Sequence, residues 1–147
     1  MKAHIGVDTD SGLVHTVVGS PANVNEVTQG HALLHSEQAE VFADAGYQGA
    51  EKRPEATEVN WHIAMRPGKR RVLSKATKLG ALLDNIEKLK ASMRAKVKHP
   101  FGVIKRQFGF TKVRYRGVAK NTAQLVTLFA LSNLWMARRV LIDGARG

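Results

Sequence analysis

One acidic residue marks the stretch of sequence best placed to do chemistry. Asp44 follows a short apolar run at residues 41–43, and two glycines, Gly46 and Gly49, interrupt the chain soon afterwards. A short apolar run that ends near glycine is typical of a buried strand. In open α/β sheets, binding sites lie beyond the carboxyl ends of the strands. Asp44 is therefore a candidate metal-binding carboxylate, with a turn or helix-capping Asp as the alternative interpretation.

Positive charge dominates the second half of the chain. The 147 residues include 23 Lys and Arg against 12 Asp and Glu, which gives a formal net charge of +11. Between Glu87 and Asp143 there is no acidic residue. Solubilising faces usually mix the two signs of charge. The one-signed segment therefore favours a polyanionic partner, most simply nucleic-acid phosphate.

Two basic clusters are the candidate DNA contacts. Residues 66–71 follow an expected strand and contain Pro-Gly, which predicts a loop. Residues 112–117 alternate basic with apolar side chains, which predicts an extended segment. Contacts of such cations with phosphate position DNA but carry no base information, and a solvated charged loop is the alternative. Together with one cation of the intervening helix, the candidate DNA-binding residues are Arg66, Lys69, Arg70, Arg71, Lys105, Lys112, Arg114 and Arg116.

The composition argues against several other kinds of protein. There is no Cys, so disulfides and thiolate zinc sites are not available. No uninterrupted apolar run reaches the roughly 18 residues that a membrane span needs, and no signal peptide is visible. We therefore expect a cytoplasmic protein with no membrane partner.

The elements expected around Asp44 begin with a hairpin. Residues 3–8 and 13–18 read as strands and residues 9–12 as their turn. Asn23 and Glu26 resemble a capping box, which predicts a helix to about His35. Strands are then expected at 41–44 and 59–65, with a short helix or loop between them.

The remaining chain is expected to be helical. From Leu79 apolar residues recur at helical spacing, which predicts a helix of about 30 residues with Thr77 as its N-cap. Pro100 predicts a kink or break near residues 97–100, because it removes an amide donor. Asn121 is the expected N-cap of a last helix that runs to about residue 140. This order of elements predicts one mixed α/β domain.

Several motifs together resemble bacterial insertion-sequence transposases of the DDE type. They are MKAHIGVD at residues 1–8, FADAGY at 42–47, RPG at 66–68, HPF at 99–101 and KVRYRG at 112–117. The resemblance covers nearly the whole chain and is to the C-terminal part of such a transposase. It implies a partial ribonuclease-H-like fold over residues 1–142, without the first acid-bearing strand, and a frayed tail at 143–147.

The resemblance implies the chemistry of DNA transposition. Such enzymes nick the transposon ends and join the freed 3′-hydroxyl to target DNA, with two Mg²⁺ ions held by two Asp and one Glu. Asp44 matches the second acid and so the metal-ligand position. In the helical Tyr-Arg-Glu-Lys motif of the family, Arg94 and Lys105 match the Arg and the Lys. Ala91 and Lys98 stand at the Tyr and Glu positions.

These departures leave one acid of three. The first Asp would lie on a strand upstream of the matched segment, and Asp8 is more simply a turn residue. Lys98 replaces a metal-binding carboxylate with an ammonium, which repels Mg²⁺ and could pair with Asp44 in its place. The resemblance therefore predicts a truncated, catalytically inactive transposase remnant that does not bind Mg²⁺ by itself.

Two alternatives remain open. The chain could be a non-catalytic basic DNA-binding module that modulates a full-length transposase or associates with a second copy of itself. It could also be a basic RNA-binding protein. Only Tyr115 lies among the cations, however, whereas RNA-binding strands commonly carry aromatic residues for base stacking.

Overall fold

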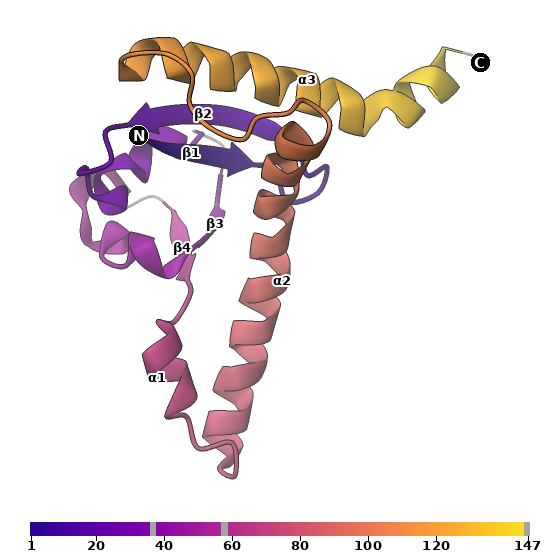
Figure 1. Cartoon of the computed structure of the whole chain (residues 1–147). Coiled ribbons are helices and arrows are strands. Elements are labelled where there is room, and N and C mark those ends of the chain that lie inside the picture. The colour runs from indigo at the N-terminus through magenta and orange to yellow at the C-terminus, as the bar shows by residue number, and fades with distance from the viewer. Residues whose placement is uncertain (36–37, 57–58, 146–147) are drawn as a thin grey trace. The chain divides into compact units, whose positions relative to one another are not determined.

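The computed structural model describes residues 1–35, 38–56 and 59–145. Its strands and α-helices are β1 (Lys2–Val7), β2 (Val14–Ser20), β3 (Glu40–Ala43), β4 (Asn60–Ile63), α1 (Pro67–Arg71), α2 (Lys78–Arg106) and α3 (Val118–Gly144) (Figure 1). The expected mixed α/β class is confirmed. The chain divides into unit 1, which is Met1–Val24 with Lys96–Gly147, and unit 2, which is Asn25–Ala95. Helix α2 therefore contributes to both units.

The β1–β2 hairpin is the sheet of unit 1. The strands pair antiparallel with Ile5 opposite Val17, as the alternation predicts. Asp8 closes the turn, because its carboxylate accepts hydrogen bonds from the Ser11 hydroxyl at 2.5 Å and the Ser11 N–H at 2.7 Å. These bonds hold the pKa of Asp8 below its usual value. The turn role expected for Asp8 is confirmed.

The core of unit 1 forms where α3 and the end of α2 meet the hairpin. The Phe101 and Phe129 rings pack edge to face with centroids 5.2 Å apart. Helix α2 is continuous through Pro100, so the expected break is wrong. The Pro100 ring is fully buried, and tertiary packing here outweighs the lost amide donor. The buried apolar cluster consists of Ile5, Val14, Ile104, Leu125 and Phe129.

An amide of α3 completes the hydrogen bonding of β2. Asn133 Oδ1 accepts from the Val14 N–H at 2.9 Å, and Asn133 Nδ2 donates to the Val14 carbonyl at 2.7 Å. A side-chain amide carries both a donor and an acceptor. Asn133 therefore gives Val14 the two bonds that a neighbouring strand would give.

Helix α3 differs from the expectation that no segment of the chain is long and apolar enough to span a membrane. Its 27 residues are long and apolar enough to cross a membrane by length and composition, with a mean hydropathy of 1.4 over an 18-residue window. The expectation considered only uninterrupted apolar runs and is wrong on this point. In unit 1 the helix lies along the hairpin (Figure 1) and buries Leu125 and Phe129. A mostly buried core helix of a soluble protein passes the same test, whereas 17% of this window is buried.

Strands β3 and β4 form the sheet of unit 2. They pair in parallel with Phe42 opposite His62, whose rings stack with centroids 4.8 Å apart. His62 also hydrogen-bonds to Glu40, and this contact together with Asn60 lowers the pKa of Glu40. Both strands were expected, although β4 is shorter than predicted. Between them the chain forms 3₁₀ turns at Ala50–Lys52 and Pro54–Ala56, and the rest of the expected helix or loop lies outside the described residues.

The helix expected from Asn23 to about His35 is wrong. The chain forms 3₁₀ turns at Glu26–Gln29 and His31–Leu33, and Asn25 caps the first by accepting from the Val27 N–H. Gly30 is buried, and a Cβ there would lie 3.2 Å from the Trp61 ring. A side chain at this position would therefore crowd that ring.

Helix α1 replaces the loop expected at residues 66–71. Pro67 occupies the first helical turn, where its missing N–H has no intrahelical partner to lose. Thr77 is the N-cap of α2 as expected, since its hydroxyl accepts from the Gly80 N–H at 3.1 Å. Asn121 is not the cap of α3, because the helix begins at Val118 and Gly117 stands at the cap.

Charged side chains on one side of α2 form ion pairs and hydrogen bonds that stabilise unit 2. Asp84 and Glu87 are only 4% and 5% exposed. Arg70 of α1 approaches Asp84 Oδ1 with two nitrogens at 3.0 Å. Glu87 accepts from the Met65 N–H at 2.9 Å, and its other oxygen pairs with Lys90 at 3.1 Å.

The apolar stripe of α2 lies on another side of the helix. Leu79, Leu82 and Leu89 are 67%, 57% and 69% exposed. Residues three and four apart share a helix face, so this stripe and the charged side form two separate surfaces. The first part of the stripe that predicted the helix is therefore exposed, whereas Ile104 near the end of the helix is fully buried.

We predict that Asn133→Ala destabilises the chain by about 1–3 kcal/mol, because the buried N–H and carbonyl of Val14 lose their partners. Urea unfolding followed by circular dichroism measures the change. The exposed Asn85→Ala on α2 is the matched control, with an expected change within about 0.5 kcal/mol. Equal effects of the two substitutions would contradict the assigned role of Asn133.

We predict that Asp84 stabilises the fold in a pH-dependent way. Hydrogen bonding from Arg70, then from Lys88, lowers the pKa of Asp84 below its ordinary value of 3.8. The stabilisation is therefore complete above pH 3.8 and is lost as the pH falls through the lower pKa of the folded state. The difference in unfolding free energy between the wild type and Asp84→Asn should shrink over that range in urea titrations. A difference that does not change with pH would contradict the prediction.

Candidate functional site

Asp44 lies at the end of β3, where the sequence pattern placed it. Its backbone is extended, with φ −69° and ψ 161°, and its carbonyl accepts from the Tyr47 N–H at 2.9 Å to start the 3₁₀ turn Ala45–Tyr47. The Asp44 side chain makes no capping hydrogen bond and is 54% exposed. The carboxylate is therefore available to groups outside its own turn.

Arg94 is the ion-pair partner of Asp44. The Arg94 Nε atom lies 2.6 Å from Asp44 Oδ1. The guanidinium comes from α2 and is less exposed than the carboxylate. The pair carries no net charge, so a divalent cation approaching Asp44 would also meet the positive charge of Arg94.

A second carboxylate lies against the Asp44 turn. A Cβ on Gly46 would come within 2.1 Å of Glu26 Oε2, so the glycine leaves room for that side chain. Burial, followed by the charges of Glu26 and Asp44, raises the pKa of Tyr47 to about 12. The Tyr47 phenol is therefore neutral at physiological pH. The sequence interpretation placed Glu26 only in a capping box, and no local spacing connects it with Asp44.

The donor set at Asp44 does not fit a divalent metal ion. Mg²⁺ prefers a shell of oxygen ligands, but one Asp44 oxygen is occupied by a guanidinium. Within residues 1–35, 38–56 and 59–145 there is no group of three or more His, Cys, Asp or Glu that could hold a metal.

Lys98 and Lys105 belong to the other unit. Both are exposed on the part of α2 that packs in unit 1, whereas Asp44 lies in unit 2. Within unit 2 the ion-pair partner of Asp44 is Arg94, and the expected pairing of Asp44 with Lys98 stays a prediction.

The first basic cluster is partly engaged within unit 2. Arg66 stands at the cap of α1, and Lys69 and Arg71 are exposed on that helix. Arg70 is bound to Asp84. Three of the four cations are therefore accessible to a ligand, and Arg70 already has a partner.

The second basic cluster lies in an irregular segment of unit 1 rather than in an extended strand. Lys112, Arg114 and Arg116 are exposed, as is Tyr115. The Asn121 side chain fixes the segment through two hydrogen bonds with the Tyr115 backbone. Its Nδ2 donates to the Tyr115 carbonyl at 2.6 Å, and its Oδ1 accepts from the Tyr115 N–H at 3.1 Å. Sequence reasoning missed this role and treated Asn121 as a helix cap.

The family model described as the transposase DDE domain matches residues 1–134. No solved structure matches the chain. The matched span contains both basic clusters, Asp44 and Arg94. Because the match extends over most of the sequence, the chain belongs to the DDE transposase family.

Proposed function

We propose that this chain is a DNA-binding member of the transposase family that does not cut or join DNA by itself. The family acts on DNA and typically uses a divalent metal. The observation that carries the proposal is Lys98 at the position of the family Glu; the ion pair of Asp44 with Arg94 at 2.6 Å neutralises the remaining acid but involves an Arg that the family motif shares. Asp44 stands where the second acid of the family is expected, and Lys98 stands where the Glu is expected.

Charge balance supports the absence of cleavage. A site for two divalent cations needs a surplus of negative charge from several carboxylates. Asp44 is balanced by Arg94, and Glu26 is the other carboxylate that the described residues place against the turn. We therefore derive no metal-dependent step for this chain.

The sheets support an incomplete fold. Parallel sheets are usually larger and covered on both faces, whereas β3 and β4 form a sheet of only two strands in the described part of the chain. The buried apolar residues described in unit 2 are all alanines: Ala43, Ala50 and Ala64. We infer a partial ribonuclease-H-like domain over residues 1–142 that lacks the first acid-bearing strand.

A second candidate function is modulation of a full-length transposase in a bacterial cytoplasm. The exposed stripe of α2 at Leu79, Leu82 and Leu89 favours this candidate, because such contiguous apolar surface commonly marks an interaction site. A full-length transposase or a second copy of the chain could cover it. Binding to transposon ends would then compete with the active enzyme.

We predict that binding to duplex DNA weakens steeply with salt. The logarithm of the binding constant should fall with that of the salt concentration, with a slope of about −0.9 for each phosphate neutralised. The triple variant K112A/R114A/R116A should flatten the slope by up to about 2.7 if each side chain meets one phosphate. Fluorescence anisotropy at several salt concentrations measures both slopes.

The control for this prediction is K52A/K78A, which removes exposed cations outside both basic clusters. Its slope should stay close to that of the wild type. An affinity that does not respond to salt would refute the proposed mode of binding. Stronger binding to structured RNA than to duplex DNA at equal salt would favour the RNA-binding alternative.

We predict that the chain shows no Asp44-dependent binding of Mn²⁺ and no Mg²⁺-dependent nicking of DNA. Calorimetric titration with Mn²⁺ measures the first, and a supercoiled-plasmid assay the second. Asp44→Asn is the matched control, and its traces should be the same as those of the wild type. Mn²⁺ binding or nicking that disappears in Asp44→Asn would overturn the proposal.

A further inference from the structure

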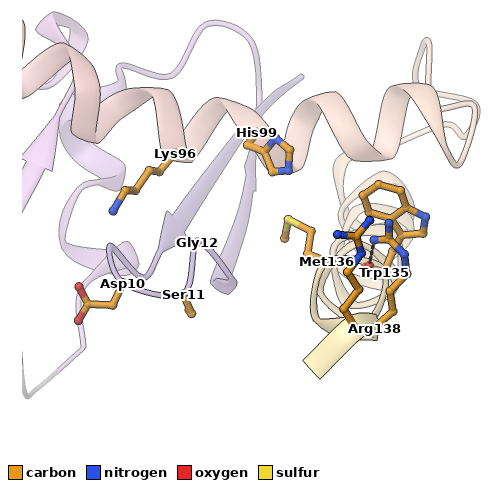
Figure 2. A pocket seen from close by; sticks show the side chains of 9 residues that line it. Asp10, Ser11, Gly12, Lys96, His99, Trp135, Met136 and Arg138 are labelled. Carbon is orange, nitrogen blue, oxygen red and sulfur yellow. Dashed lines mark hydrogen bonds between the residues drawn. The ribbon is translucent and has the colours of Figure 1, made fainter. Parts of the chain in front are cut away.

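A groove in unit 1 lies apart from the residues assigned so far. It has a volume of about 480 Å³ and is bounded by residues 10–12 of the hairpin turn, by α2 and by the last turns of α3 (Figure 2). All of its walls belong to one unit. The lining residues from the two helices are Lys96, His99, Trp135, Met136, Arg138 and Arg139.

The groove carries an excess of positive charge. Lys96, Arg138 and Arg139 line it, against the single carboxylate of Asp10. The Lys96 ammonium hydrogen-bonds to the Thr9 carbonyl, which uses one of its three donors and leaves the others for a ligand. An anionic ligand is therefore favoured.

The groove also contains a flat aromatic and cationic platform. The Arg138 guanidinium lies over the Trp135 ring, with Cζ 3.8 Å from the ring centroid (Figure 2). Arg138 also donates to the Trp135 carbonyl, so the stacked pair is held from two sides. Planar guanidinium and indole groups are surfaces on which nucleic-acid bases stack. Beside them, the thioether of Met136 adds apolar lining.

The size of the groove selects one part of a nucleic acid. A volume of this order suits a small ligand, whereas a DNA duplex keeps its bases stacked inside and offers mainly its backbone to a flat surface. An unpaired base can leave the stack and reach an aromatic side chain. Phosphates on either side of that base would remain close to the surrounding cations.

We propose that this groove binds one unpaired nucleotide of a DNA strand, with its base on the Trp135–Arg138 pair and its phosphate near Lys96 and Arg139. The inference rests on the proposed function in that it takes DNA as the ligand. It adds a preference for single-stranded over duplex DNA. The preference depends on unit 1 alone and not on Asp44.

The test uses the fluorescence of Trp135. The chain has two Trp residues, so Trp61→Phe, which keeps an aromatic ring at position 61, leaves Trp135 as the only indole. Titration with a ten-residue oligothymidylate should quench its emission. In anisotropy measurements Trp135→Ala should weaken single-strand binding by about 5- to 150-fold, since stacking of one base is worth about 1–3 kcal/mol. Duplex binding should change less than about twofold.

Two further variants keep the test valid if Trp135→Ala fails to fold. Trp135→Phe should retain most of the single-strand affinity because it keeps a stacking ring. The double variant K96Q/R139Q should weaken single-strand binding more than duplex binding. The control K52A/K78A should weaken both ligands to the same small extent.

The alternative outcomes are distinguishable. Thymidine monophosphate that binds as tightly as the oligonucleotide would show a free-nucleotide site and overturn the strand assignment. Equal loss of duplex and single-strand affinity in Trp135→Ala would overturn the inference but not the proposed function. Absence of binding to any DNA would overturn the proposed function itself.

Discussion

Two buried carboxylates on α2 hold unit 2 together. A buried charge is costly unless it is paired and hydrogen-bonded, and each of these acids binds a group from another segment of the chain. Asp84 binds Arg70 of α1, and Glu87 binds the Met65 N–H just beyond β4. Arg94 follows on the same side of the helix and binds Asp44. Because the described buried apolar residues of this unit are alanines, charge rather than apolar packing fixes the position of the Asp44 turn.

The same constraint leaves the apolar stripe of α2 exposed. Asp84 and Glu87 bind unit 2 through one side of the helix, so Leu79, Leu82 and Leu89 on another side stay in solvent. Turning the helix to bury these leucines would take both carboxylates away from their partners, and a buried charge left unpaired is strongly destabilising. The exposed stripe is therefore a consequence of the ionic contacts. It is an apolar surface open to association.

Local patterns predicted local structure, and long-range contacts account for the errors. The hairpin, β3 and the Thr77 cap follow from alternation, glycine and capping chemistry within a few residues. In place of the helix expected after Asn23, the chain forms two short 3₁₀ turns that meet at Gly30. The break at Pro100 is absent because that ring is packed in the core. For the site, the sequence placed Asp44 at a strand end but could not identify Arg94 as its partner, since no spacing rule links residues of different elements.

The two parts of the proposed function, no metal chemistry and retained DNA affinity, are physically compatible. Metal binding needs several residues at once, whereas DNA affinity is a sum over separate residues. A two-metal site fails when one carboxylate is missing, since the ions need all of their oxygen ligands together. Phosphate binding sums over separate cations, each of which contributes on its own. In the proposed function, Lys98 at the position of the family Glu would remove an oxygen ligand and would add a positive charge that attracts phosphate. The same substitution would then act against metal binding and in favour of DNA binding. An inactive domain of this family can in this way remain a DNA-binding protein.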